Sequence, residues 1–241
     1  MIIRAALCPS PPLLARELTG RDVALPDLRD ACATAVALLL AAGPDTVTVV
    51  GGAPATATWG AGDRLDLAAF APVLRGRVPG GTPGLPAPVG LGAMLLDEAG
   101  YDGPLVLQAV GQSAPADECV RLGASLAAAG ERTGLLVMGD GTAKRTPKAP
   151  GHFDERAEPF DASVEKAVRS GDMPALAALD AGLARDLMAT GRAAWQVLAG
   201  ALGAAMSPSA SSSPGEVLYS GAPYGVSYLV AVLEPMAAPV V

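Results

Sequence analysis

The side chains best suited to acid–base chemistry in this chain are Asp140 and His152. His152 is the one histidine among 241 residues, and an imidazole with an unperturbed pKa of ~6.5 suits proton transfer. It could equally be a surface residue that caps the helix following Asp154. Asp140 stands between two glycines after an apolar run, where a carboxylate either accepts hydrogen bonds from its own turn or acts as a catalytic or ligand carboxylate. Both residues are candidate catalytic residues.

A cluster of basic residues follows Asp140. Lys144, Arg145 and Lys148 lie in the segment 139–153, in a protein whose net charge is −7. A strand end followed by Gly-Asp-Gly and cations can present N–H groups and positive charge to an anion. The alternative is a solvated loop whose charges only maintain solubility. The chain contains no G-x-G-x-x-G or G-x-x-x-x-G-K-[ST] motif, which argues against a dinucleotide or P-loop site.

Composition excludes several classes of protein. Seventeen basic and 24 acidic residues give the wrong sign of charge for binding nucleic acid. No run of about 18 apolar residues indicates a membrane span. The first residues, MIIRAALCPSPPLL, do not resemble a signal peptide, so we expect a cytoplasmic protein. Three widely spaced cysteines (Cys8, Cys32 and Cys119) favour neither a zinc site nor a disulfide framework.

The elements that must position these residues follow an alternating pattern. Apolar runs that end in glycine or proline alternate with helical patterns, which predicts a single α/β domain over 1–241 with a mostly parallel central sheet flanked by helices. The predicted strands are 2–7, 45–50, 105–110 and 134–138, with closing strands at 216–219 and 226–233. The predicted helices are 26–42, 89–98, 117–129, 159–169, 173–179, 181–189 and 191–204. Loops are expected at 78–88 (Gly/Pro-rich) and 207–214 (Ser/Pro-rich).

Ligand sites of open α/β sheets form where the carboxyl ends of strands meet loops. The predicted strand ends carry a set of residues that we expect to line a ligand-binding cleft. These are Ser10, Gly52, Asp140, Thr142, Lys144 and Arg145.

Four segments of the chain together resemble the class III extradiol ring-cleavage dioxygenases, the LigB-like superfamily that includes Memo-type proteins. They are CPSPPLL (8–14), VTVVGG (47–52), MGDGTA (138–143) and YGVSYLVA (224–231), in the order found in that family. The resemblance implies a LigB-like fold and a site in which two histidines and a glutamate hold Fe(II), with a further histidine as acid/base. The histidine positions of the family correspond here to Ser10, Gly52 and Ala143, and Glu216 is the one residue that could keep the role of the carboxylate ligand.

Serine is a poor ligand for Fe(II) and glycine has no side chain, so the iron site that the resemblance implies is degenerate. We therefore expect a diverged member of the family that keeps the cleft for a small anionic or aromatic ligand, with no cofactor. Two alternatives stay open. One is a catalytically silent structural or partner subunit, as a homo-oligomer or with another protein. The other is a metal-dependent dioxygenase with Fe(II) or Zn(II) in an altered site, formed by Cys8, Asp140, His152 and Glu216. Whether the chain is an enzyme is left open.

Overall fold

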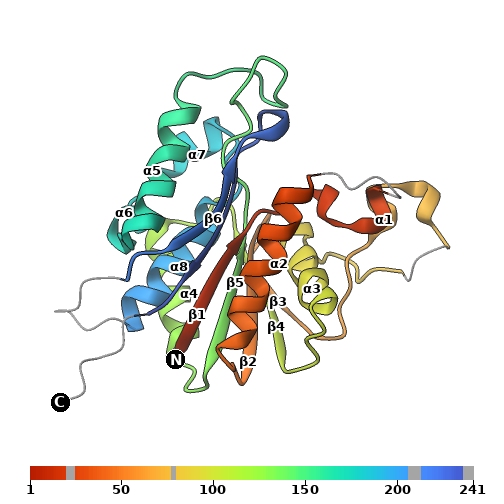
Figure 1. Cartoon of the computed structure of the whole chain (residues 1–241), viewed down its shortest axis with the longest axis vertical. Helices are drawn as coiled ribbons and strands as arrows, with labels where there is room; N and C mark the ends of the chain where they lie inside the picture. The colour runs from red at the N-terminus through yellow and green to blue at the C-terminus, as the bar shows by residue number, and fades with distance from the viewer. Residues whose placement is uncertain (20–24, 77–79, 206–212, 236–241) are drawn as a thin grey trace.

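A mixed sheet forms the centre of the molecule (Figure 1). The computed structural model describes residues 1–19, 25–76, 80–205 and 213–235. In these residues the sheet has seven strands in the order β3-β4-β2-β5-β1-β7-β6. The strands are β1 (Ile2–Cys8), β2 (Thr46–Ala53), β3 (Ala57–Gly60), β4 (Leu105–Gly111), β5 (Thr133–Met138), β6 (Glu216–Gly221) and β7 (Tyr228–Leu233).

The four central strands, β4, β2, β5 and β1, are parallel. The strands at both edges are antiparallel: β3 pairs with β4, β7 with β1, and β6 with β7. β6 and β7 are joined by a short turn, and a short turn can only connect antiparallel neighbours. The predicted parallel sheet is therefore confirmed at its centre, and the turn explains the antiparallel pairing of β6 with β7 at one edge.

Helices cover both faces of the sheet. α2 (Pro26–Ala41) and α3 (Ala87–Glu98) pack on one face, and α4 (Ala116–Ala127), α5 (Ala157–Ser170) and α8 (Arg192–Ala205) pack on the other. The shorter helices are α1 (Arg16–Thr19), α6 (Met173–Ala177) and α7 (Ala181–Asp186), with 3-10 turns η1 (Pro12–Leu14), η2 (Leu67–Ala69), η3 (Pro72–Leu74) and η4 (Pro223–Gly225). None of the helices in the described part of the chain is long and apolar enough to cross a membrane.

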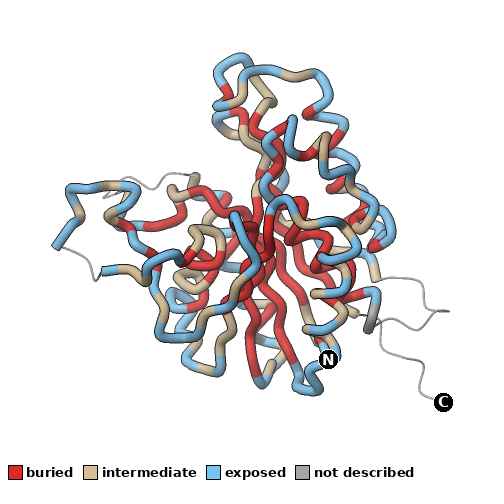
Figure 2. The backbone as a smooth tube through the Cα atoms, turned by 180° about the vertical axis from the view of Figure 1, so that it is seen from behind, coloured by how far each residue is buried: buried red, intermediate tan, exposed pale blue. Residues whose placement is uncertain are grey.

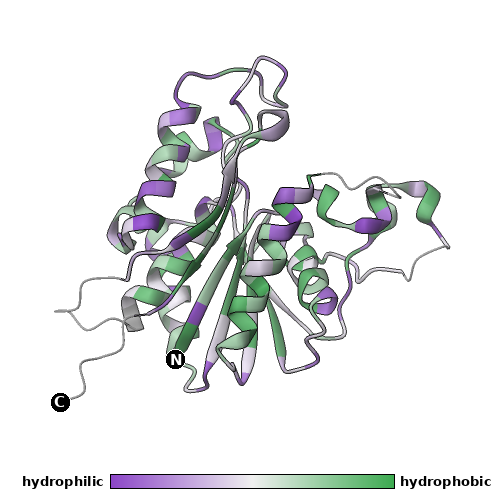
Figure 3. Ribbon diagram, in the orientation of Figure 1, coloured by the Kyte–Doolittle hydropathy of each residue, from purple (hydrophilic) through white to green (hydrophobic). Residues whose placement is uncertain are grey.

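Burial explains why the central strands are nearly continuous apolar runs. Every residue of β2 and β5 is buried. Figure 2 shows that the middle of the sheet is buried, and Figure 3 shows that hydrophobic residues predominate there. Strands covered on both faces need apolar side chains on both. Alternate residues enter two separate cores: Val50 and Val137 contact the α8 side, whereas Val49 and Leu136 contact the α2 side.

The helices on the α8 side approach one another closely through glycine. A Cβ built on Gly123 of α4 would lie 2.0 Å from the carbonyl oxygen of Val197, and one built on Gly200 of α8 would lie 2.1 Å from that of Val120. Only glycine permits this separation. The packing fixes α8, whose first residues adjoin the carboxyl edge of the sheet.

The predicted strands and most predicted helices are confirmed. The short edge strand β3 was not predicted, and the structure shortens the helices at 173–179 and 181–189 to α6 and α7. Two parts of the predicted loops, 78–79 and 207–212, lie outside the described residues.

Candidate functional site

Asp140 and Ser10 meet at the carboxyl ends of β5 and β1, as predicted. The backbone N–H of Ser10 donates to Asp140 Oδ1 at 2.6 Å. Burial raises the pKa of Asp140 to about 6, and hydrogen bonds from the N–H and hydroxyl of Ser10 oppose that rise. The pKa of the nearby Tyr228 phenol is also raised, first by its own burial and then by the charge of Asp140. This pair therefore holds a half-buried carboxyl group that changes charge near neutral pH.

Gly52 does not line an open cleft. A Cβ on Gly52 would lie 3.0 Å from the Thr190 carbonyl oxygen and 3.1 Å from Gln112 Cγ. A Cβ on Gly139 would lie 2.4 Å from the Cα of Gly191. The backbone that leads into α8 thus fills the space beside these two strand ends, and no imidazole could enter it from position 52.

The other positions of the implied iron site offer no ligands either. Ala143 is buried, and its N–H donates to the Leu187 carbonyl oxygen at 3.1 Å. Glu216 is exposed at the start of the edge strand β6, where it pairs in register with Val232 rather than lying at the carboxyl edge. The structure places no three His, Cys, Asp or Glu residues, among those it describes, where they could hold a metal ion. The side chains present do not fit the family's Fe(II).

His152 lies in an exposed turn and is not among the groups that shift the pKa of Asp140. Its φ is 58°, and its backbone N–H donates to the Ala149 carbonyl oxygen. It is not the N-cap of α5, because that helix begins at Ala157 and its N-cap residue is Arg156. Asp154 instead accepts hydrogen bonds from the backbone and side chain of Arg156, and these bonds lower its pKa to about 2.

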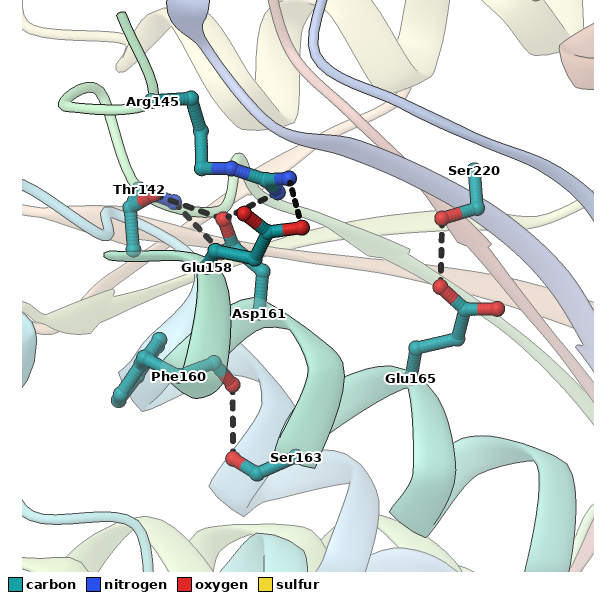
Figure 4. Close-up of polar contacts among 8 residues, drawn as sticks. All are labelled: Thr142, Arg145, Glu158, Phe160, Asp161, Ser163, Glu165 and Ser220. Atoms are coloured by element: carbon teal, nitrogen blue, oxygen red, sulfur yellow. Dashed lines mark hydrogen bonds and ion pairs between the residues drawn. The ribbon is translucent and has the colours of Figure 1, made fainter. Parts of the chain in front are cut away.

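The basic segment after Asp140 is only partly available to a ligand. Arg145 is engaged with carboxylates: Nη1 donates to Asp161 Oδ2 at 3.2 Å, and Nη2 lies 3.3 Å from Glu158 Oε1 (Figure 4). Lys148 is exposed and Lys144 is half-buried. Arg145 therefore serves first to balance acidic side chains of α5.

Asp161 is the central residue of this cluster, and sequence reasoning missed it. Its carboxylate accepts from the Thr142 N–H at 2.9 Å, from the Thr142 hydroxyl at 2.7 Å and from Arg145. Burial raises the pKa of Asp161, and these hydrogen bonds counteract the rise. Thr142, predicted to contact a ligand, is fully buried and positions Asp161 instead. Asp in a helical pattern is ordinarily exposed, so nothing in the sequence distinguished it.

A cavity of about 220 Å³ adjoins this cluster, between α5, the end of β5 and the turn from β6 to β7. Its polar side includes Arg145, Asp161 and Glu165, and Glu165 accepts a hydrogen bond from Ser220 at 2.6 Å. Its apolar side includes Trp195 and Leu229. The cavity can therefore hold a small molecule that has an apolar body and several hydrogen-bonding groups.

Comparison with known proteins extends the description of the fold. No protein-family model matches the chain. No curated protein matches it either. Among solved structures, the chain is similar to the crystal structure of the uncharacterized protein JW3007 from Escherichia coli K12, with a TM-score of 0.54 and 19% identity. The match covers 96% of this chain and 99% of that one. At this identity the likeness establishes the fold alone.

Proposed function

We propose that this protein is a diverged relative of the class III extradiol dioxygenases that binds a small hydroxylated aromatic molecule without Fe(II). The four segments described above support the ancestry. The residues Ser10, Gly52 and Ala143 support the loss of iron, because none of them offers an imidazole. The free, buried thiols of Cys8, Cys32 and Cys119 suit a reducing compartment such as the cytoplasm.

This proposal rests on the cavity beside Asp161, which has a polar side and an apolar side. A ring would lie against Trp195 and Leu229, while its hydroxyl groups donate to Asp161 and accept from Ser227. Small-molecule sites commonly combine an apolar lining with a few polar groups that fix orientation. Arg145 is the one basic residue among the described residues that line the cavity, whereas the lining carries three carboxylates, those of Glu158, Asp161 and Glu165. This balance favours a neutral ring over an anionic one.

We propose binding rather than ring cleavage as the role of this site. Asp140, whose pKa is about 6, and His152 are not among the residues lining the cavity. General acid–base catalysis requires such a group within hydrogen-bond reach of the reacting atom. The lining of the cavity therefore lacks the histidine that serves as acid/base in the family.

A titration of 4-methylcatechol would test the proposal. The chain has two tryptophans, so a Trp59→Phe variant leaves Trp195 in the cavity as the fluorescence reporter. We expect saturable quenching in this background. Ala162→Leu at the cavity lining should weaken binding about tenfold, whereas Ser163→Leu, its exposed neighbour outside the lining, should not.

Two results would refute the proposal. Quenching that does not saturate, or that is unchanged by Ala162→Leu, would remove the cavity as the site. Stoichiometric Fe(II) binding in an anaerobic calorimetric titration, followed by oxygen uptake with the catechol, would show that the protein is a dioxygenase with unusual ligands.

A second role, as a partner subunit or homo-oligomer, is favoured by exposed apolar side chains near this end of the sheet. Phe153, Met188 and Tyr224 are 61%, 44% and 66% exposed. Large apolar side chains exposed together are typical of protein interfaces. Light scattering after size-exclusion chromatography would test this role, and a monomer at all concentrations would count against self-association.

A further inference from the structure

A second and larger cavity, of about 380 Å³, lies between α3, the segment 61–67 and the residues that lead into β4. It shares no lining residue with the cavity beside Asp161. Its volume lies within the range of about 300 to 1,000 Å³ typical of small-molecule sites. The segment that closes it is held by backbone contacts, including the Thr82 N–H donating to the Arg64 carbonyl oxygen at 2.7 Å.

The lining of this cavity separates into an apolar floor and an acidic rim. Leu65, Met94 and Leu105 contribute to the floor, and the two leucines at 65 and 67 are almost fully buried. The lining also carries five carboxylates and a single basic residue, Arg64. The acidic residues are Glu17, Asp63, Asp97, Glu98 and Asp102.

Most of this negative charge is not neutralised within the described residues. Glu98 lies 3.5 Å from Arg16, and Asp63 accepts a hydrogen bond from the Gly60 N–H at 2.8 Å. Neither Asp97 nor Asp102 has an ion pair in the part of the chain that the structure describes. Charge of one sign around an apolar recess concentrates the electrostatic field there.

From this combination we infer that the cavity is a binding site for a small organic cation, a protonated primary amine with an apolar body. The body would lie on Leu65, Met94 and Leu105, where it leaves water. The ammonium group, with three donors, would reach the carboxylates of Asp97 and Asp102 at the rim. The carboxylates do not converge as a group of three around one point, among the described residues, so the arrangement suits an organic cation rather than a metal ion.

Three probes of similar shape and different charge test the inference. Calorimetry would compare 2-phenylethylamine, 2-phenylethanol and phenylacetate at pH 7.5 and low salt. We expect the amine to bind most tightly and phenylacetate least. Asp97→Asn and Asp102→Asn should each weaken binding of the amine about two- to fivefold, as expected for exposed ion pairs, and leave binding of the alcohol unchanged. Asp117→Asn is the matched control, since Asp117 is an exposed carboxylate on α4, on the other face of the sheet.

The cavity itself is tested by Ala93→Leu, which adds bulk at the lining and should weaken binding of all three probes. Because Asp97 and Asp102 are exposed, their variants should fold even if Ala93→Leu does not, and circular dichroism would confirm this. The inference is overturned if none of the probes binds, if phenylacetate binds as tightly as the amine, or if the Asp97 and Asp102 variants behave as Asp117→Asn does. These outcomes do not depend on whether the protein binds a catechol, because Trp195 and Asp161 line the other cavity.

Discussion

Asp140→Asn should change how the stability of this protein depends on pH. The pKa of Asp140 is about 6 in the folded protein, against about 3.9 in an unfolded chain. The folded state therefore binds the proton more tightly, so stability falls as pH rises through this window. The asparagine side chain keeps an oxygen that can accept the Ser10 N–H and cannot ionise.

The size of the effect follows from the two pKa values. Ionisation of Asp140 should cost the folded state about 1 kcal/mol at pH 4.5 and about 3 kcal/mol at pH 7.5. The difference in free energy of unfolding between Asp140→Asn and the wild type should therefore shift by about 2 kcal/mol in favour of the variant between these pH values. Any constant effect of the amide cancels in this comparison.

Urea unfolding of both proteins at pH 4.5, 6.0 and 7.5 would measure this shift. Asp154→Asn is the control, because hydrogen bonds from Arg156 lower the pKa of Asp154 to about 2. Both this value and the unfolded value of about 3.9 lie below the measured range, so the difference between Asp154→Asn and the wild type should stay constant from pH 4.5 to 7.5. A difference between Asp140→Asn and wild type that is constant across the range would refute the burial of a titrating carboxylate at this strand end.

Four further substitutions test the packing of the molecule. Asp161→Ala should lower the free energy of unfolding by about 3 to 5 kcal/mol, because the buried donors of Thr142 lose their charged acceptor. A loss below about 1 kcal/mol, measured by urea unfolding, would contradict the hydrogen bonds between Thr142 and Asp161. Gly123→Ala should lower the free energy of unfolding by about 1 to 3 kcal/mol or more. Gly203→Ala in α8 is its control, since a Cβ there meets nothing within 4 Å, and this variant should be more stable by up to about 1 kcal/mol. Thermal melts that show the same change for both variants would exclude the close helix packing. Gly52→His should lower the melting temperature without creating stoichiometric Fe(II) binding by calorimetry, and tight binding there would show that the space can open.

The strand-end part of the candidate site was predictable because it depends on local sequence. Ser10 and Asp140 each follow an apolar run that ends in a turn, and neighbouring parallel strands bring such ends together. Their hydrogen bond is the result. Gly52 was assigned to the same cleft, yet its neighbour is the backbone at Thr190. That contact depends on how α8 packs against the sheet, and no local sequence pattern predicts that packing.

The basic segment shows the same limit in electrostatics. Lys144, Arg145 and Lys148 form a cluster when read along the chain, and this pattern was consistent with either an anion site or a solvated loop. In the structure α5 places Asp161 and Glu158 against Arg145, so its charge is balanced by the helix that follows the loop. Long-range ion pairs of this kind leave no periodic signal.

The sequence by itself determined the α/β architecture, because apolar runs, helical spacing and glycine or proline turns are local consequences of chain geometry and burial. It also determined that imidazole ligands are absent at Ser10, Gly52 and Ala143. Only the tertiary structure decided that Thr142 is buried beneath Asp161, and that the two cavities form where they do. Those features form where segments far apart in the chain come into contact. Which contacts form depends on the free energy of packing of the whole molecule.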